Sequence, residues 1–141
     1  SIIRCSAAFG IDAIFVTDDC CDAWYRQSVR VSMGYIAKVP IIEVSKKMLA
    51  LVLSKLKDCG ITCYAASSQE GAKQLSLEEL RKDDIPSQWC CVFGNEANGI
   101  QPLVMEACSY SIRIKMVDGV DSLSVSVAAG ILLHGFLYKA K

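Results

Sequence analysis

Three short, continuous runs of apolar residues constrain the fold of this chain more than any other feature. They occupy residues 11–17 (IDAIFVT), 61–66 (ITCYAA) and 89–94 (WCCVFG). Each run is rich in strand-forming residues and does not alternate with polar positions, which is typical of strands buried on both faces of a parallel sheet. Longer stretches with helical periodicity separate the runs. The sequence therefore predicts an α/β domain with a mainly parallel sheet flanked by helices.

Helix signals lie on both sides of these runs. Gly10 is suited to close a first helix and Gly60 a second one, because glycine readily adopts the left-handed conformation that ends many helices. Ser76 and Glu79 have the spacing of a capping box, and residues 67–75 form the only plainly polar loop. We expect helices at residues 1–9, 45–59, 22–33, 76–82, 101–108 and 122–139, with weaker strands at 39–44 and 110–114.

The length and charge of the chain limit what it can be. Its 141 residues suit one domain, since compact domains run to about 100–200 residues. An apolar fraction of 52% with 21% charged residues excludes disorder and implies a large core. The formal net charge is zero, so the chain lacks the overall positive field of an autonomous nucleic-acid binder. Any contact with RNA or DNA should be local or assisted.

The eight cysteines do not predict a metal site. No two are spaced as C-x-x-C, and a single histidine cannot complete a Cys/His zinc site. We expect reduced, structural thiols and no metal, which is typical of a reducing, cytoplasmic compartment. The longest apolar stretch, residues 125–138, is interrupted by polar and small residues and is shorter than the ~20 residues that span a bilayer. We therefore predict a buried helix and no membrane contact.

Two segments have a pattern suited to ligand binding. In residues 92–100 a buried strand leads into Gly94, a polar turn, Gly99 and a helix. Gly94 could let a ligand approach the backbone, and Gly99 could supply a positive φ, although a plain tight turn between strand and helix fits as well. In residues 112–130 a strand and a loop lead into a helix beginning near Ser122 and Ser124. Free backbone NH groups there suit a carboxylate or phosphate, while Ser122 could equally be a simple helix cap.

In this order, the segments resemble the three motifs of the SpoU (TrmH-like) branch of the SPOUT RNA methyltransferases. The resemblance covers essentially the whole chain. Arg4 matches the arginine of the first motif, whose Asn and Gly would precede Ser1. The second motif is matched at Phe93, Gly94, Glu96 and Gly99, and the third at Ile114, Met116, Ser122, Leu123, Val125, Ser126 and Ala128. Two positions depart from the third motif: Lys115 replaces a proline, and Ser124 replaces the usual asparagine.

The resemblance implies a SPOUT-type fold with a C-terminal deep trefoil knot. It also implies transfer of the methyl group of S-adenosylmethionine to a ribose 2′-hydroxyl of structured RNA, with ribosomal RNA favoured and transfer RNA possible. Members of the family usually act as homodimers through the knot region. We expect residues 1–141 to be the catalytic domain, with an upstream strand and any RNA-binding domain missing, and a chain of this extent to have little activity by itself. An organellar location is open if a targeting sequence lay upstream.

The resemblance also implies roles for particular residues. The S-adenosylmethionine pocket would be lined by Ala66, Gly94, Ile114, Met116 and Leu123. In the catalytic group, Arg4 would bind phosphate and stabilise the developing alkoxide, because a guanidinium stays protonated. Glu96 would orient Arg4 or anchor its turn, and Ser122 and Ser124 would fix the third-motif loop.

Two other readings stay open. The first is a knotted RNA-binding or assembly paralogue with impaired catalysis, which Lys115 and Ser124 would favour. The second is an unknotted α/β domain that binds some other nucleotide.

Overall fold

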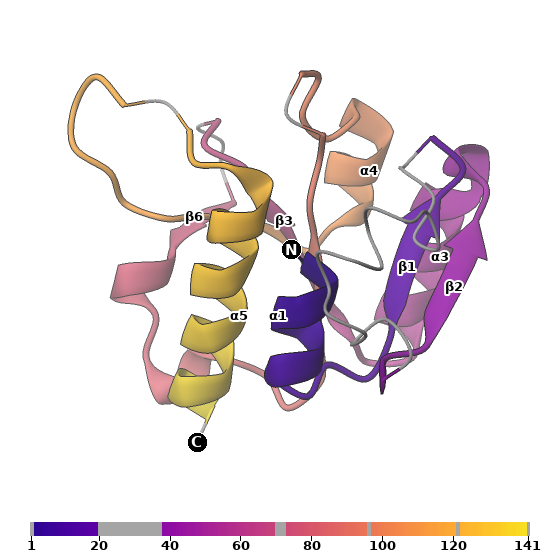
Figure 1. The fold of residues 1–141 in the computed structure, drawn as a ribbon, viewed down its shortest axis with the longest axis horizontal. Coiled ribbons are helices and arrows are strands. Elements are labelled where there is room, and N and C mark those ends of the chain that lie inside the picture. Colours follow the sequence, from indigo (N-terminus) through magenta and orange to yellow (C-terminus); the bar gives the residue numbers. More distant parts are fainter. Residues whose placement is uncertain (1, 20–37, 70–72, 96, 121, 141) are drawn as a thin grey trace. The chain divides into compact units, whose positions relative to one another are not determined.

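The structure is a computed structural model that describes residues 2–19, 38–69, 73–95, 97–120 and 122–140. The chain forms two compact units, Ser1–Leu49 and Ala50–Lys141 (Figure 1). Each unit is an assembly of helices and parallel strands, so the predicted α/β class is confirmed. The helix predicted at residues 22–33 lies outside the described residues.

The first unit is built around two parallel strands. It contains α1 (Ile2–Ala8), β1 (Ile14–Thr17), β2 (Ile41–Val44) and the 3-10 turn η2 (Lys46–Met48). The helix ends as predicted at Gly10, which has a φ of 67°. Ile14 lies opposite Ile41 in the register of the two strands. Beyond the strands, the carboxylate of Asp18 accepts a hydrogen bond of 2.9 Å from the backbone NH of Lys46, which joins the end of β1 to the turn after β2.

The second unit holds a four-stranded parallel sheet in the order β4-β6-β3-β5. Strand β6 is inserted between β3 and β4, although both precede it in the chain. Three of its strands coincide with predicted ones. The elements are α3 (Leu49–Asp58), β3 (Thr62–Ala66), β4 (Gln74–Ser76), η3 (Leu77–Glu79), η4 (Lys82–Asp84), β5 (Trp89–Val92), α4 (Pro102–Ala107), β6 (Tyr110–Arg113) and α5 (Val125–Ala140).

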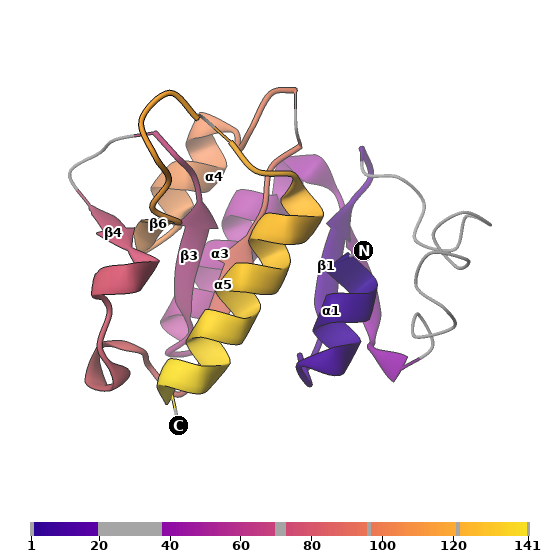
Figure 2. The ribbon, with the colours of Figure 1, turned by 60° about the vertical axis from the view of Figure 1, so that its left-hand side comes forward.

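Helices cover this sheet on both faces (Figure 2). Successive residues of a strand point to opposite faces, and β3 shows both environments. Tyr64 faces α5, where its ring centroid lies 4.9 Å from that of Phe136. Its neighbour Cys63 faces α3, with its sulfur 3.9 Å from the carbonyl oxygen of Leu53. Burial on both faces explains why the strand sequences are continuously apolar.

Helix α5 contributes two buried residues to the apolar cluster on its face of the sheet. Leu132 and Phe136 are buried in one cluster with Tyr64 and Ile112. The far end of the helix is held by Lys139, whose ammonium donates to the carbonyl oxygens of Leu77 and Leu80. In the described part of the chain, no helix is long and apolar enough to cross a membrane.

The prediction of a helix at residues 76–82 is wrong. The chain forms two separate 3-10 turns there, η3 and η4. Ser76 is the last residue of β4 and pairs with Arg113 of β6, so its backbone belongs to the sheet. Its hydroxyl donates to the carboxylate of Glu78 over 2.6 Å and does not cap a helix. The predicted polar loop at residues 67–75 likewise ends early, because β4 begins at Gln74.

Candidate functional site

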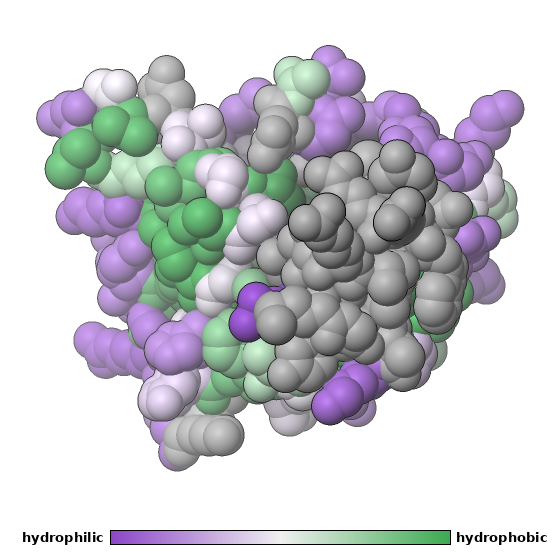
Figure 3. Space-filling model, viewed as in Figure 1, coloured by the Kyte–Doolittle hydropathy of each residue, from purple (hydrophilic) through white to green (hydrophobic). Residues whose placement is uncertain are grey.

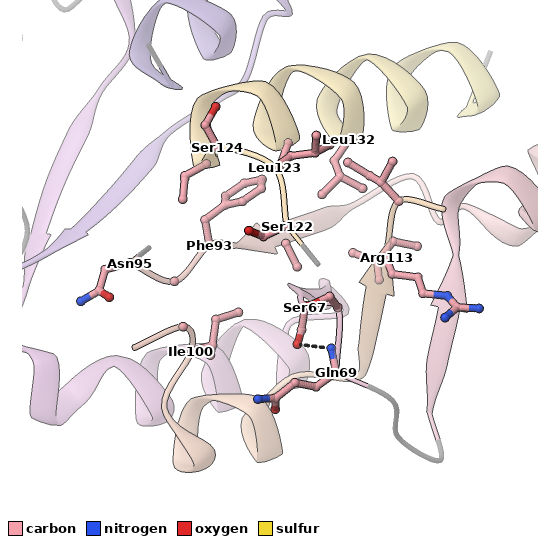
Figure 4. Close-up of a pocket in the computed structure, with 18 of the residues that line it drawn as sticks. Ser67, Gln69, Phe93, Asn95, Ile100, Arg113, Ser122, Leu123, Ser124 and Leu132 are labelled. Atoms are coloured by element: carbon pink, nitrogen blue, oxygen red, sulfur yellow. Dashed lines mark hydrogen bonds between the residues drawn. The ribbon is translucent and has the colours of Figure 1, made fainter. Parts of the chain in front are cut away.

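A cavity of about 550 Å³ opens at the carboxyl ends of β3, β5 and β6 (Figure 4). Its walls come from residues 66–69 at the end of β3, the turn after β5, residues 112–114 and 116 at the end of β6, and the start of α5. Ligands of open parallel sheets bind at this edge, and the volume lies within the usual range for small-molecule pockets. The second unit thus carries a preformed site.

The turn after β5 is held by the side chain of Asn95. Its Oδ1 accepts hydrogen bonds from the backbone NH groups of Ala97 at 2.9 Å and Asn98 at 2.6 Å. The carbonyl oxygen of Asn95 also accepts from the NH of Gly99 at 2.9 Å. These bonds fold the turn back on itself and leave Asn95 and Asn98 on the cavity wall.

The packing of the backbone in this turn requires glycine at position 94. A Cβ at this position would lie 2.2 Å from the carbonyl carbon of Gly99 and 2.6 Å from the nitrogen of Ile100. Gly94 lines the cavity, but the space beside its Cα is filled by backbone and not left for a ligand. Gly99 has the predicted positive φ, at 65°.

Ser124 caps helix α5. The helix begins at Val125, and the NH of Ala128 donates to the carbonyl oxygen of Ser124 over 2.9 Å. The Ser124 hydroxyl accepts a longer bond, 3.4 Å, from the NH of Val127. The expectation that Ser122 could be the cap is therefore wrong, and the Ser122 side chain is left exposed at the cavity wall.

The structure brings most of the predicted site residues into this one cavity. Arg4 is exposed on α1, in the first unit, and is not among the residues that line the cavity. Glu96 lies outside the described residues. The functional roles of all these residues stay predictions. The predicted residues that line the cavity are Ala66, Gly94, Ile114, Met116, Ser122, Leu123 and Ser124.

Other residues of the cavity were not among the predicted site residues. Phe93, Ile100 and Leu132 add apolar wall. Ser67 lies there too, with its hydroxyl accepting a hydrogen bond of 3.2 Å from the NH of Gln69 (Figure 4). Ser67 directly follows β3, so the rule that ligands bind at the carboxyl ends of strands could have found it.

A carboxylate outside the cavity holds the loop after β6. The Oε1 of Glu78 accepts a hydrogen bond of 3.0 Å from the backbone NH of Lys115. Burial would raise the pKa of Glu78, but hydrogen bonds from Ser76 and Lys115 and the charge of Lys139 outweigh it, so the pKa is lowered. Among the residues that the structure describes, no group of three or more His, Cys, Asp or Glu side chains could hold a metal ion.

Comparison with known proteins decides the family. The SpoU rRNA Methylase family matches the chain over residues 1–134. The chain belongs to this family. A protein of Staphylococcus epidermidis assigned to the TrmH family of tRNA/rRNA methyltransferases is 31% identical to the SpoU chain over 134 residues. The match covers 95% of this chain and 51% of that protein. A counterpart in Staphylococcus aureus is 29% identical over the same shares, so the chain spans about half the length of these relatives.

Solved structures share the fold of the SpoU chain. A protein from Porphyromonas gingivalis assigned to the TrmH family of RNA methyltransferases superposes with a TM-score of 0.82 at 26% identity, over 96% of this chain and 52% of that one. A structure named as an RNA 2′-O ribose methyltransferase superposes with a TM-score of 0.75 at 28% identity. The match covers 98% of this chain and 50% of that one. An AdoMet-bound rRNA methyltransferase from Sinorhizobium meliloti gives 0.82 at 20% identity, over 99% and 51%, and shows the common fold.

Replacing Gly94 by alanine should destabilise the SpoU chain more than replacing Gly99. At Gly99 a Cβ would meet open space, and the cost is the strained φ alone, about 1–2 kcal/mol. At Gly94, whose φ is not positive, the cost is steric: the backbone of two residues must move away from contacts as short as 2.2 Å, which should cost about 3 kcal/mol or more, the upper end for overpacking. Urea unfolding of the two variants measures the difference. Equal losses would contradict the close approach of Gly94 to Gly99.

The cap on α5 can be tested at Ser124. Ser124→Ala removes the hydroxyl acceptor and should lower the free energy of unfolding by about 0.5–2 kcal/mol. Ser124→Asn should retain most of the stability, because asparagine is an equally good N-cap. Thermal or urea unfolding of both variants checks this, and an asparagine variant as unstable as the alanine one would argue against capping.

Proposed function

We propose that this SpoU chain is a methyltransferase domain that transfers the methyl group of S-adenosylmethionine to a ribose 2′-hydroxyl of structured RNA. The observation that carries the proposal is the cavity at the carboxyl ends of β3, β5 and β6, whose walls are formed by residues of the second and third motifs. The match to the SpoU rRNA Methylase family supports it. So do a solved relative named as an RNA 2′-O ribose methyltransferase and another with AdoMet bound.

The residues of the cavity fit S-adenosylmethionine. The bound group would supply an activated methyl on a sulfonium cation, with an adenine ring and a short amino-acid tail. Phe93, Ile114 and Leu123 offer apolar surface for the ring. The polar groups of Ser67, Gln69 and the turn after β5 offer hydrogen bonds at the same wall. Apolar surface combined with a few placed polar groups is typical of a small-molecule site, and this cavity offers both.

Methyl transfer between two bound partners is mainly a matter of orientation. In this proposal Arg4 binds an RNA phosphate and stabilises the alkoxide that develops on the 2′-oxygen. The guanidinium group is a poor general base in proteins, so this role is electrostatic. The proton passes instead to phosphate or water. Glu96 would orient Arg4 or its turn, while Ser122 and Ser124 fix the loop that enters α5.

The finer points of the fold belong to the same proposal. A C-terminal trefoil knot is supported by the insertion of β6 between the two earlier strands β3 and β4. A homodimer is supported by apolar side chains exposed along α5, which include Val127, Ile131 and Tyr138. Figure 3 shows such surface gathered over α5 and the loop before it. Residues 1–141 would then be the catalytic domain of a cytoplasmic enzyme that acts on ribosomal or transfer RNA.

Cofactor binding can be tested at Leu123. Isothermal titration of the full-length protein with S-adenosylmethionine should show one site per chain. Leu123→Ala should weaken binding about tenfold, as expected for the loss of about 1.4 kcal/mol of apolar contact. Leu103→Ala is the matched control, because Leu103 is 70% exposed on α4 and does not line the cavity. Equal affinities of the two variants would place the cofactor elsewhere.

The enzyme and the impaired paralogue make different predictions for Arg4. In the enzyme, Arg4→Ala should lower kcat at least about 100-fold, as losses of transition-state charge stabilisation do, with the cofactor affinity unchanged. Labelled methyl transfer to unmodified RNA, followed by mass spectrometry of 2′-O-methyl nucleosides, measures this. A wild-type protein that binds S-adenosylmethionine normally but transfers no methyl group would favour the paralogue.

A further inference from the structure

The 3-10 turn η3 joins two walls of the cavity without lining it. On one side of the turn, the carboxylate of Glu78 accepts hydrogen bonds from the hydroxyl of Ser76 at 2.6 Å and from the NH of Lys115 at 3.0 Å. Ser76 ends strand β4, whereas Lys115 lies in the loop after β6. Lys115 is 37 residues from Glu78 in the chain. Hydrogen bonds to an ionised carboxylate are stronger than those between neutral groups.

The position of Lys115 gives this bond its importance. Ile114 and Met116, on either side of it, both line the cavity. The hydrogen bond that Glu78 accepts therefore fixes the backbone of Lys115, which lies between these two wall residues. The loop continues as an exposed segment with a turn in which the NH of Val120 donates to the carbonyl oxygen of Val117 over 3.3 Å.

On its other side the same turn is fastened to α5. The ammonium of Lys139 donates to the carbonyl oxygens of Leu77 and Leu80, the latter at 2.7 Å. The side chain of Leu77 also packs so close to Gly135 that a Cβ on this glycine would lie 2.9 Å away. Because α5 begins at the cavity wall, η3 is a common support for the loop after β6 and for the helix that follows.

We propose that Glu78 is a positioning residue for the S-adenosylmethionine pocket, acting through the backbone NH of Lys115. This inference rests on the proposed function. A proline at position 115, which the third motif has, would stiffen the loop by fixing φ but would offer no NH to a carboxylate. With lysine there, the hydrogen bond from the peptide NH to Glu78 supplies the restraint. Glu78 touches no reacting group and acts only on the geometry of Ile114 and Met116.

The experiment compares Glu78→Ala with Glu79→Ala in the full-length protein. Glu79 is the matched control, since it is an exposed carboxylate on the same turn. Titration with S-adenosylmethionine should give a Kd about tenfold higher for Glu78→Ala, the usual cost of a lost charge-assisted hydrogen bond. Glu79→Ala should bind like the wild type. Glu78→Gln should recover part of the affinity, because its amide oxygen can still accept from Lys115.

A second change separates positioning through Lys115 from a general loss of structure. Adding Lys115→Pro to Glu78→Ala should restore most of the affinity, because the ring fixes the backbone and removes the unpaired NH. The coupling between the two sites is read from the double-mutant cycle. A double variant that binds as weakly as Glu78→Ala, or more weakly, would overturn the inference.

The failures of the two proposals are distinguishable. A wild-type protein that does not bind S-adenosylmethionine would overturn the proposed function. Normal binding by both the wild type and Glu78→Ala would overturn only the positioning role.

The pH dependence of cofactor binding offers an independent readout. The groups that face the carboxylate of Glu78 are Ser76, Lys115 and Lys139. The pKa of Glu78 is lowered in the folded protein. The contribution of its carboxylate to cofactor affinity is therefore fully present above the ordinary pKa of a glutamate, about 4.3. It is lost as the pH falls through the lowered pKa.

Discussion

The packing of α5 on the sheet is the interaction on which the second unit depends. The ring of Phe136 stacks on that of Trp89 with centroids 4.8 Å apart, and it lies tilted against the ring of Tyr64 at 4.9 Å. Phe136 and Ile112 are fully buried. These contacts join the last helix to β3, β5 and β6 together. Since α5 runs from the carboxyl edge of the sheet, the same packing brings its first turn to the cavity. The core and the site are thus parts of one arrangement.

The cavity follows from parallel strand direction, from one close backbone approach and from one hydrogen bond between a side chain and the backbone. Strands β3, β5 and β6 end at the same edge, so the loops that leave them must share the space above it. The turn after β5 is compact because Gly94 lets the backbone of Gly99 and Ile100 lie against it. The loop after β6 is held from below by Glu78. These two walls are therefore restrained by contacts that no ligand makes.

The sequence predicted the buried strands better than the short turns between them. Residues 61–66 and 89–94 were recognisable because a strand covered on both faces is apolar throughout. The capping-box spacing of Ser76 and Glu79 was misleading, since the pairing of Ser76 with Arg113 is a long-range contact that no local pattern contains. The wall residues at positions 114, 116 and 123 were predicted from the resemblance, not from physical chemistry. The bond between Glu78 and Lys115 joins distant segments and had no local signal.

The two departures from the third motif weigh differently once their contacts are known. Ser124 keeps a hydroxyl that caps α5, a task that serine performs as well as asparagine. Lys115 keeps an NH that proline would lack, and this NH has a partner in Glu78. Both residues thus support the backbone of the cavity in ways that suit their own chemistry. Neither departure therefore disrupts the backbone of the cavity, so Lys115 and Ser124 give no support to the impaired paralogue.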